Sequence, residues 1–323
     1  MEMDLKKFAQ DKEILITGGA GFLGSYLCEA FIEASAKVTC LDNFASGLAS
    51  NVDSLKDNKN FTFVEHDISK PIYFENKFDL VMHMASRASP FEFDKYPIQI
   101  LKANTLGIWV ALGIAKKHGA RFVYTSTSEV YGNPDPKFVP TPETYNGNVN
   151  PIGPRGCYDE SKRAGEAFVV AYRHQHGIDT RMARIFNTYG PRMRADDIYG
   201  RALPRFIDQA QKGEDITVFG DGSQTRSFTY VTDQVEGLLR LAAMDEAAGA
   251  VINIGNNKET SILELAEMIK KLTNSTSKIT FHPLPEDDPL RRCPDISRAK
   301  KILDWTPKVP LEEGLKGIIE WFR

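Results

Sequence analysis

Short apolar runs alternate with longer segments of helical spacing along the first half of the chain. Short runs that stop at glycine or polar residues predict strands, and apolar residues that recur every three to four positions predict helices. The predicted strands cover 13–17, 37–42, 61–65, 78–84, 121–126 and 180–185, and the predicted helices cover 22–34, 97–118 and 158–176. Strands that alternate with helices in this way build a parallel sheet that is covered on both faces.

The alternation breaks after Asn187, where glycines become frequent and the pattern predicts only a short helix at 201–211. A helix over 231–243 and a strand over 250–254 resume the pattern, and we expect them to return to the sheet. The remaining amphipathic segments predict helices at 261–272, 297–303 and 311–322.

These patterns predict an α/β fold of two interleaved units. The larger unit is a Rossmann-type, doubly wound parallel sheet built from residues 1–186 and 231–256. The smaller unit is a C-terminal substrate-binding lobe built from residues 187–230 and 257–323. A length of 323 residues agrees with about two structural units.

Composition and charge narrow the class of protein. With 40 Lys and Arg against 43 Asp and Glu, the net charge of −3 makes the chain a poor candidate for nucleic-acid binding. The 4 cysteines form no C-x-x-C pair and the 6 histidines show no metal-ligand spacing, so we expect no metal site. Residues 1–11 lack the apolar core of a signal peptide, and no run approaches the roughly 20 apolar residues that span a bilayer. We therefore expect a cytoplasmic protein without a membrane partner.

A glycine-rich turn lies between the first predicted strand and the first predicted helix. It satisfies G-x-G-x-x-G through Gly19, Gly21 and Gly24, and a second glycine pattern begins at Gly18. Glycines at these positions let the backbone approach a pyrophosphate, which then meets the free N–H groups of the helix. Asp42 ends the second predicted strand, about 20 residues further on, where a carboxylate accepts hydrogen bonds from a ribose 2′-OH. The turn therefore predicts a dinucleotide site, and Asp42 favours NAD over NADP.

Tyr158 and Lys162 are four residues apart and share one face of a predicted helix. An ammonium group beside a phenol favours the phenolate, so Tyr158 is a candidate base for a substrate hydroxyl. Tyr73 and Lys77 have the same spacing, but they lie in a segment predicted to be an exposed loop. Tyr158 instead belongs to the helix that follows a strand ending in hydroxyl side chains at 125–128, on the sheet edge where α/β folds bind ligands.

These motifs resemble the extended short-chain dehydrogenase/reductase superfamily of nucleotide-sugar enzymes. Within it, the longer motifs look like those of the UDP-glucuronate decarboxylase (UDP-xylose synthase) family. The segments that carry the resemblance are 17–24, 83–86, 125–132, 150–163, 183–193, 220–228 and 287–295, together with Asn104. The resemblance runs from about residue 12 to the end of the chain.

The resemblance implies a reaction and a set of residues for it. NAD would oxidise C4 of UDP-glucuronate, the C6 carboxylate would leave as CO₂, and reprotonation and reduction would give UDP-xylose with NAD regenerated. Glu129 matches a glutamate expected near C5, where it would help place a water or a proton donor, and Arg292 matches an arginine near the sugar. The implied catalytic residues are Thr127, Glu129, Tyr158, Lys162 and Arg292.

The resemblance also implies which residues bind the two ligands and how subunits associate. The implied cofactor-binding residues are Gly18, Gly21, Phe22, Leu23, Gly24, Asp42, Asn43, Asp67, Ile68, Met84, Ala85, Tyr158 and Lys162. The implied substrate-binding residues are Lys102, Ser128, Asn187, Arg226 and Arg292, of which Asn187 and Arg226 match diphosphate contacts. Members of the family usually form homodimers through the helices at 97–118 and 158–176.

Two positions depart from the family pattern, and related activities provide alternatives. Ser161 stands where the family usually has glycine, and Arg87 replaces a usual proline near the sugar. Sugar-nucleotide 4,6-dehydratases use an Asp-Glu pair where this chain has Ser128 and Glu129. The 4-epimerases usually lack the glutamate but share the first oxidation, so an epimerase is the strongest enzymatic alternative. A non-catalytic NAD-binding scaffold is disfavoured because the Thr, Tyr and Lys are all present.

Overall fold

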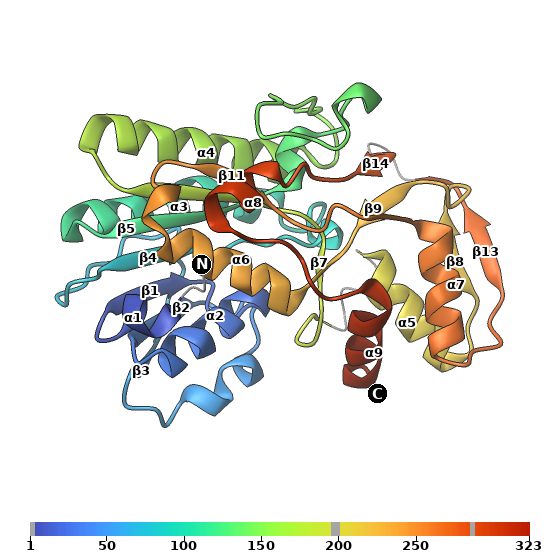
Figure 1. The fold of residues 1–323 in the computed structure, drawn as a ribbon, viewed down its shortest axis with the longest axis horizontal. Helices are drawn as coiled ribbons and strands as arrows, with labels where there is room; N and C mark the ends of the chain where they lie inside the picture. Colours follow the sequence, from blue (N-terminus) through green and yellow to red (C-terminus); the bar gives the residue numbers. More distant parts are fainter. Residues whose placement is uncertain (1–3, 195–200, 285–287) are drawn as a thin grey trace.

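The computed structural model describes residues 4–194, 201–284 and 288–323. Its centre is a parallel sheet of 7 strands in the order β11-β6-β5-β4-β1-β2-β3 (Figure 1). The strands are β1 (Glu13–Thr17), β2 (Lys37–Asp42), β3 (Phe61–Glu65), β4 (Leu80–His83), β5 (Arg121–Thr127), β6 (Thr180–Ile185) and β11 (Val251–Ile254). The chain winds outward in both directions from β1 and β4, which confirms the predicted doubly wound sheet.

Helices cover both faces of this sheet, and each face has its own apolar core. One face carries α1 (Leu5–Ala9), α2 (Phe22–Glu33) and α6 (Val231–Ala243), and its core contains Leu27 and Leu238. The other face carries α3 (Pro97–His118) and α4 (Gly156–His176), and its core contains Ile108 and Val169. The strands between these layers are nearly continuous apolar runs because a parallel sheet is buried on both sides.

A smaller lobe follows, in which strands of two to four residues link three helices. Its helices α5 (Ala202–Lys212), α7 (Ile262–Leu272) and α9 (Leu311–Trp321) enclose a core that includes Phe206, Leu265 and Leu315. Its strands are β7 (Thr188–Tyr189), β8 (Ile216–Phe219), β9 (Thr225–Ser227), β10 (Thr229–Tyr230), β12 (Glu259–Ser261), β13 (Ile279–His282) and β14 (Arg291–Arg292). They pair as β10-β7, β12-β9-β14 and β13-β8.

One helix lies outside the unit to which its sequence position assigned it. The predicted boundary placed α8 (Ser297–Leu303) in the smaller lobe, but α8 packs against α6 and β11 of the large sheet. Ala299, Leu303 and the following Trp305 are buried in the core that contains α2 and α6. The Trp305 indole N–H also donates to the backbone oxygen of Asp233, 3.0 Å away. Amphipathic spacing alone does not tell which of two cores receives a helix.

Helix α3 is long and apolar enough to cross a membrane by length and composition, contrary to the expectation that no segment approaches this limit. Its most apolar stretch is 44% buried inside the protein. Ile100, Ile108 and Leu112 are fully buried. A core helix of a parallel sheet meets the same length and composition criterion as a membrane span.

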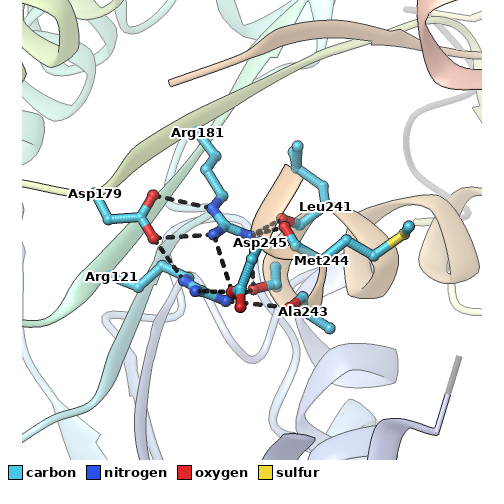
Figure 2. A network of polar contacts seen from close by, with 8 residues as sticks. Arg121, Asp179, Arg181, Leu241, Ala243, Met244 and Asp245 are labelled. Atoms are coloured by element: carbon cyan, nitrogen blue, oxygen red, sulfur yellow. Dashed lines mark hydrogen bonds and ion pairs between the residues drawn. The ribbon is translucent and has the colours of Figure 1, made fainter. Parts of the chain in front are cut away.

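A polar network at the amino ends of β5 and β6 holds the carboxyl end of α6 (Figure 2). Arg181 is fully buried and donates to the backbone oxygens of Leu241 and Met244, at 2.8 and 2.6 Å. Asp179 pairs with both Arg181 and Arg121, at 2.9 Å in each case. The last carbonyls of a helix lack partners within the helix, so the buried guanidinium satisfies them and fixes α6 against the sheet.

Candidate active site

The main cavity lies between the carboxyl ends of the central strands and the smaller lobe, and residues of both line it. It has a volume of about 1210 Å³. A single small-molecule pocket typically measures about 300–1,000 Å³, so this cavity is large enough for a dinucleotide and a second ligand together.

Most of the predicted site residues line this one cavity. Those in its wall are Gly18, Gly21, Phe22, Leu23, Gly24, Asp42, Asn43, Asp67, Ile68, Met84, Ala85, Lys102, Thr127, Ser128, Glu129, Tyr158, Lys162, Asn187 and Arg226. Arg292 is the predicted residue that does not line it.

The glycine-rich turn between β1 and α2 has the shape that a pyrophosphate requires. Gly18 has φ +72°, and a side chain there would place its Cβ 2.7 Å from the Cα of Ala85. Helix α2 begins at Phe22, and its N-cap residue Gly21 provides no side-chain hydrogen bond. The first-turn N–H groups of α2 therefore face the cavity without a capping side chain, as an anion-binding helix terminus requires.

Asp42 ends β2, at the position from which a carboxylate contacts the ribose of a bound dinucleotide. Its carboxylate accepts hydrogen bonds from the backbone N–H groups of Ala20 and Phe44, at 3.0 and 2.8 Å. Burial raises the pKa of Asp42, and these backbone hydrogen bonds act in the opposite direction. The bonds hold the carboxylate in place and leave lone pairs to accept from a ribose hydroxyl.

Tyr158, Lys162 and Thr127 meet where β5 ends against α4. The Tyr158 ring stacks on Phe93, with ring centroids 5.0 Å apart and an angle of 16° between the planes. The Lys162 ammonium donates to the backbone oxygen of Thr125 at 2.9 Å and lies 5.9 Å from the centroid of the Tyr158 ring. The sequence spacing therefore brings the expected hydroxyl, phenol and ammonium groups together.

In the ligand-free protein, burial opposes the ionised forms of both Tyr158 and Lys162. Burial raises the pKa of Tyr158, and a hydrogen bond with Thr127 lowers it. Burial also lowers the pKa of Lys162, to about 7. Both side chains lose water here, and for Lys162 this desolvation outweighs the opposing effect of the Glu166 charge. Without a bound cofactor the phenol of Tyr158 is therefore neutral at pH 7.

Glu129 is held in an ion cluster that the sequence did not reveal. It follows β5 in a short 3-10 helix, η4 (Ser128–Tyr131), and forms ion pairs with Arg155 and with Arg292, the latter at 3.0 Å. Burial raises the pKa of Glu129, but the nearby arginines outweigh this effect and lower it to about 2. Glu129 is therefore ionised at neutral pH.

Arg155 and Asp159 complete this cluster and were missed in the sequence. Arg155 is the N-cap residue of α4 and Asp159 lies in its first turn, with an N–O distance of 3.7 Å between the two side chains. Burial and the charge of Glu129 raise the pKa of Asp159 to about 7, so Asp159 takes up a proton near neutrality. Their i,i+4 spacing within the segment 150–163 was the available signal, but it is also typical of solvated surface pairs.

The resemblance implied that Arg292 contacts the sugar, but Arg292 does not line the cavity. It lies behind the Glu129 side chain. It is 3% exposed and lies on β14 of the smaller lobe. Besides Glu129, it donates to the backbone oxygens of Ser128 and Gly132, at 3.0 and 2.6 Å. Arg292 therefore fixes η4 and the Glu129 carboxylate against the smaller lobe.

Arg87, the departure noted in the sequence, lines the cavity in a second charged group. It forms an ion pair with Glu92 and lies over the ring of Tyr96, 4.4 Å from its centroid. Glu92 is 5% exposed and precedes Phe93, the residue that stacks on Tyr158. Among the residues that the structure describes, no group of three His, Cys, Asp or Glu side chains has the geometry of a metal site.

A doubly wound sheet with a glycine-rich turn and a Thr, Tyr and Lys set at its carboxyl edge defines a Rossmann-type nucleotide-dependent oxidoreductase. The chain belongs to the NAD dependent epimerase/dehydratase family, whose model matches residues 14–255. Its cofactor is NAD, as the turn and Asp42 predicted.

The proteins that this chain is similar to include two that are named for UDP-glucuronic acid. The chain is 49% identical over 319 residues to UDP-glucuronic acid decarboxylase 1 of Danio rerio, covering 98% of this chain and 74% of that protein. Its structure resembles an epimerase of Methanothermobacter thermautotrophicus with a TM-score of 0.89, 31% identity and coverage of 99% and 94% of the two chains. It also resembles UDP-glucuronic acid 4-epimerase from Bacillus cereus, solved with UDP-glucuronic acid and NAD, with a TM-score of 0.83, 29% identity and coverage of 96% and 98%.

Proposed function

We propose that the protein decarboxylates UDP-glucuronate to UDP-xylose through a 4-keto sugar. The observation that carries this proposal is the Glu129 carboxylate, held ionised by Arg155 and Arg292 in the cluster beside the Tyr158 phenol. The near full-length similarity to a UDP-glucuronic acid decarboxylase supports it.

The chain's own residues provide the proton chemistry at C4. Bound NAD supplies the reversible oxidation and reduction of this carbon. The positive charge of the oxidised nicotinamide would add to that of Lys162 and favour the Tyr158 phenolate. The phenolate accepts the proton of the C4 hydroxyl during oxidation and the phenol returns it during reduction, while the Thr127 hydroxyl beside it orients the same oxygen. Lys162, fixed by the Thr125 carbonyl, places its positive charge near the phenol as the proton moves.

Oxidation at C4 places a ketone β to the C6 carboxylate of the sugar. The C5–C6 bond breaks, CO₂ leaves, and the electron pair of that bond enters the enolate of the 4-ketone. C5 then takes up one proton from water. Glu129 cannot donate this proton because its pKa is about 2, but its carboxylate accepts a hydrogen bond from a water and orients it. Arg155 and Arg292 hold the carboxylate in this role.

A 4-epimerase is the alternative with structural support, because the Bacillus cereus neighbour is a UDP-glucuronic acid 4-epimerase. Anion-exchange chromatography of nucleotide sugars distinguishes the two reactions after incubation with UDP-glucuronate and NAD. Decarboxylation gives a UDP-pentose that has lost the carboxylate charge. If UDP-galacturonate forms and no CO₂ is released, the proposal is wrong and the protein is a 4-epimerase.

We also propose that the protein forms a homodimer through α3 and α4, which pack side by side. Ile98, Leu106 and Trp109 form an apolar stripe along α3 and are 57%, 46% and 51% exposed, and Val170 of α4 is 55% exposed. Such a stripe favours burial against a second copy. Light scattering after size exclusion should show a dimer that Trp109→Asp converts to a monomer. The same change at Trp321, 53% exposed on α9, is the control and should leave the dimer intact.

A cytoplasmic location is proposed on the state of the cysteines. Cys28, Cys40, Cys157 and Cys293 are all free thiols, as expected in a reducing compartment. Cell fractionation with an antibody to the protein tests this location, and recovery with the membrane fraction after a high-salt wash would contradict it.

A further inference from the structure

Arg205 is a partly buried guanidinium in the cavity wall that has little to bind within the protein. It projects from α5 toward β8 in the smaller lobe. One of its terminal nitrogens donates to the backbone oxygen of Thr217 at 3.2 Å, and the guanidinium lies over the ring of Phe219, 4.6 Å from its centroid. Its Nε–H is buried and has no hydrogen-bond partner.

Four other arginines of the cavity wall differ from Arg205, because each of them forms an ion pair with a carboxylate. These pairs are Arg87 with Glu92, Arg155 with Glu129, Arg192 with Glu29 and Arg226 with Asp288. No carboxylate among the described residues forms an ion pair with Arg205, and only a longer-range attraction from Asp288 reaches it. Burial lowers the pKa of Arg205 to about 10, so the group remains charged at pH 7.

A desolvated cation without a counter-ion or a full set of acceptors costs free energy in the ligand-free protein. Substrate oxygens that enter the cavity can repay this cost, since a guanidinium offers five N–H donors in a fixed fork. The position of Arg205 indicates which substrate group this is. The glycine-rich turn and Asp42 line the sheet side of the cavity, whereas Phe219 and Arg226 line the smaller-lobe side together with Arg205.

We propose that Arg205 binds the nucleotide half of the sugar substrate, donating its free N–H groups to acceptor oxygens of UDP. The acceptor is a carbonyl of the uracil ring, which the neighbouring Phe219 can flank, or an oxygen of the diphosphate. This proposal rests on the proposed function in one respect, that the substrate is a UDP-sugar.

Isothermal titration of the full-length protein with UDP, in the presence of saturating NAD, tests the contact without requiring turnover. A charge-assisted hydrogen bond of the usual strength predicts that Arg205→Gln weakens UDP binding about 10- to 100-fold. Arg205→Lys keeps the charge but not the fork and should fall between the two proteins. Lys212→Gln removes one positive charge from the exposed end of the same helix and should leave the affinity unchanged. An unchanged affinity for UDP in Arg205→Gln overturns the proposal.

Two further measurements separate binding from a structural role and identify the acceptor. Because Arg205 has no carboxylate partner in the ligand-free protein, the melting temperature of ligand-free Arg205→Gln should stay close to that of the wild type. A marked decrease would show a structural role and overturn the proposal. Titration with uridine shows the same fold loss as UDP if the uracil is the acceptor, and a smaller loss if it is the diphosphate. Wild-type protein that fails to bind UDP would overturn the proposed function as well, whereas loss of the Arg205 effect alone would leave that function standing.

Discussion

Glu129→Gln tests the ion cluster around Glu129, because it changes how the free energy of unfolding depends on pH. In the folded protein the pKa of Glu129 is about 2, against an ordinary value of 4.5. Each pKa unit corresponds to about 1.4 kcal/mol, so the ionised carboxylate contributes about 3 kcal/mol to the free energy of unfolding at pH 7. Glutamine keeps the shape of the side chain but cannot form the ion pairs with Arg155 and Arg292.

The sign of the pH dependence follows from the lowered pKa. Stabilisation by Glu129 is complete above about pH 4.5 and is lost as the pH falls toward 2, because the unfolded chain takes up the proton first. The difference in unfolding free energy between wild type and Glu129→Gln should therefore be about 3 kcal/mol at pH 7. It should be smaller by on the order of 1 kcal/mol at pH 3.5, one unit below the ordinary pKa.

Urea unfolding followed by tryptophan fluorescence measures this difference, and the buried Trp305 provides a reporter in the core. Glu267→Gln, at an exposed position of α7, is the control and should stay within about 0.5 kcal/mol of wild type at both pH values. A difference that is equal at pH 7 and pH 3.5, or that is below about 1 kcal/mol at pH 7, would refute the assigned ionisation of Glu129.

Three further substitutions test other parts of the structure. Tyr158→Phe should lower kcat about 10²- to 10⁴-fold in steady-state assays at saturating NAD, because the proton transfer is lost; full activity would exclude Tyr158 as the base. Gly18→Ala, at φ +72° and against the Ala85 backbone, should weaken NAD binding in a fluorescence titration by at least about tenfold, and wild-type affinity would contradict the close approach. Arg181→Met should lower the unfolding free energy in urea by about 3 kcal/mol, because it removes the donor of the α6 carbonyls and leaves Asp179 with Arg121 alone; a loss below about 1 kcal/mol would show that the network in Figure 2 is not stabilising.

The large sheet was predictable because its signals are local. Helix α3 begins and ends where Pro97 and Gly119 indicated, and Asp42 ends β2 as expected. The strands of the smaller lobe were not predicted, since runs of two to four residues such as β7 and β10 are too short to show a period. Their pairing depends on contacts between segments far apart in the chain.

The sequence predicted which residues belong to the site, but it did not predict their protonation states or ion-pair partners. Spacing placed Tyr158 and Lys162 together, yet the state of each depends on burial, which a sequence motif does not report. The grouping of Glu129 with Arg155 and Arg292 joins η4, α4 and β14, and it forms only when the two units meet. The same holds for Arg205, whose lack of a carboxylate partner is a property of the folded cavity.

The central claim is that the protein removes the C6 carboxylate of UDP-glucuronate and returns its NAD to the oxidised state in each cycle. The direct measurement is ¹³C NMR of UDP-glucuronate labelled at C6, incubated with the protein and far less NAD than substrate. The account predicts that labelled CO₂ and bicarbonate appear in equal amount to UDP-xylose and greatly exceed the NAD added. Label that stays in a uronic acid, or turnover that stops when the NAD is consumed, would contradict it.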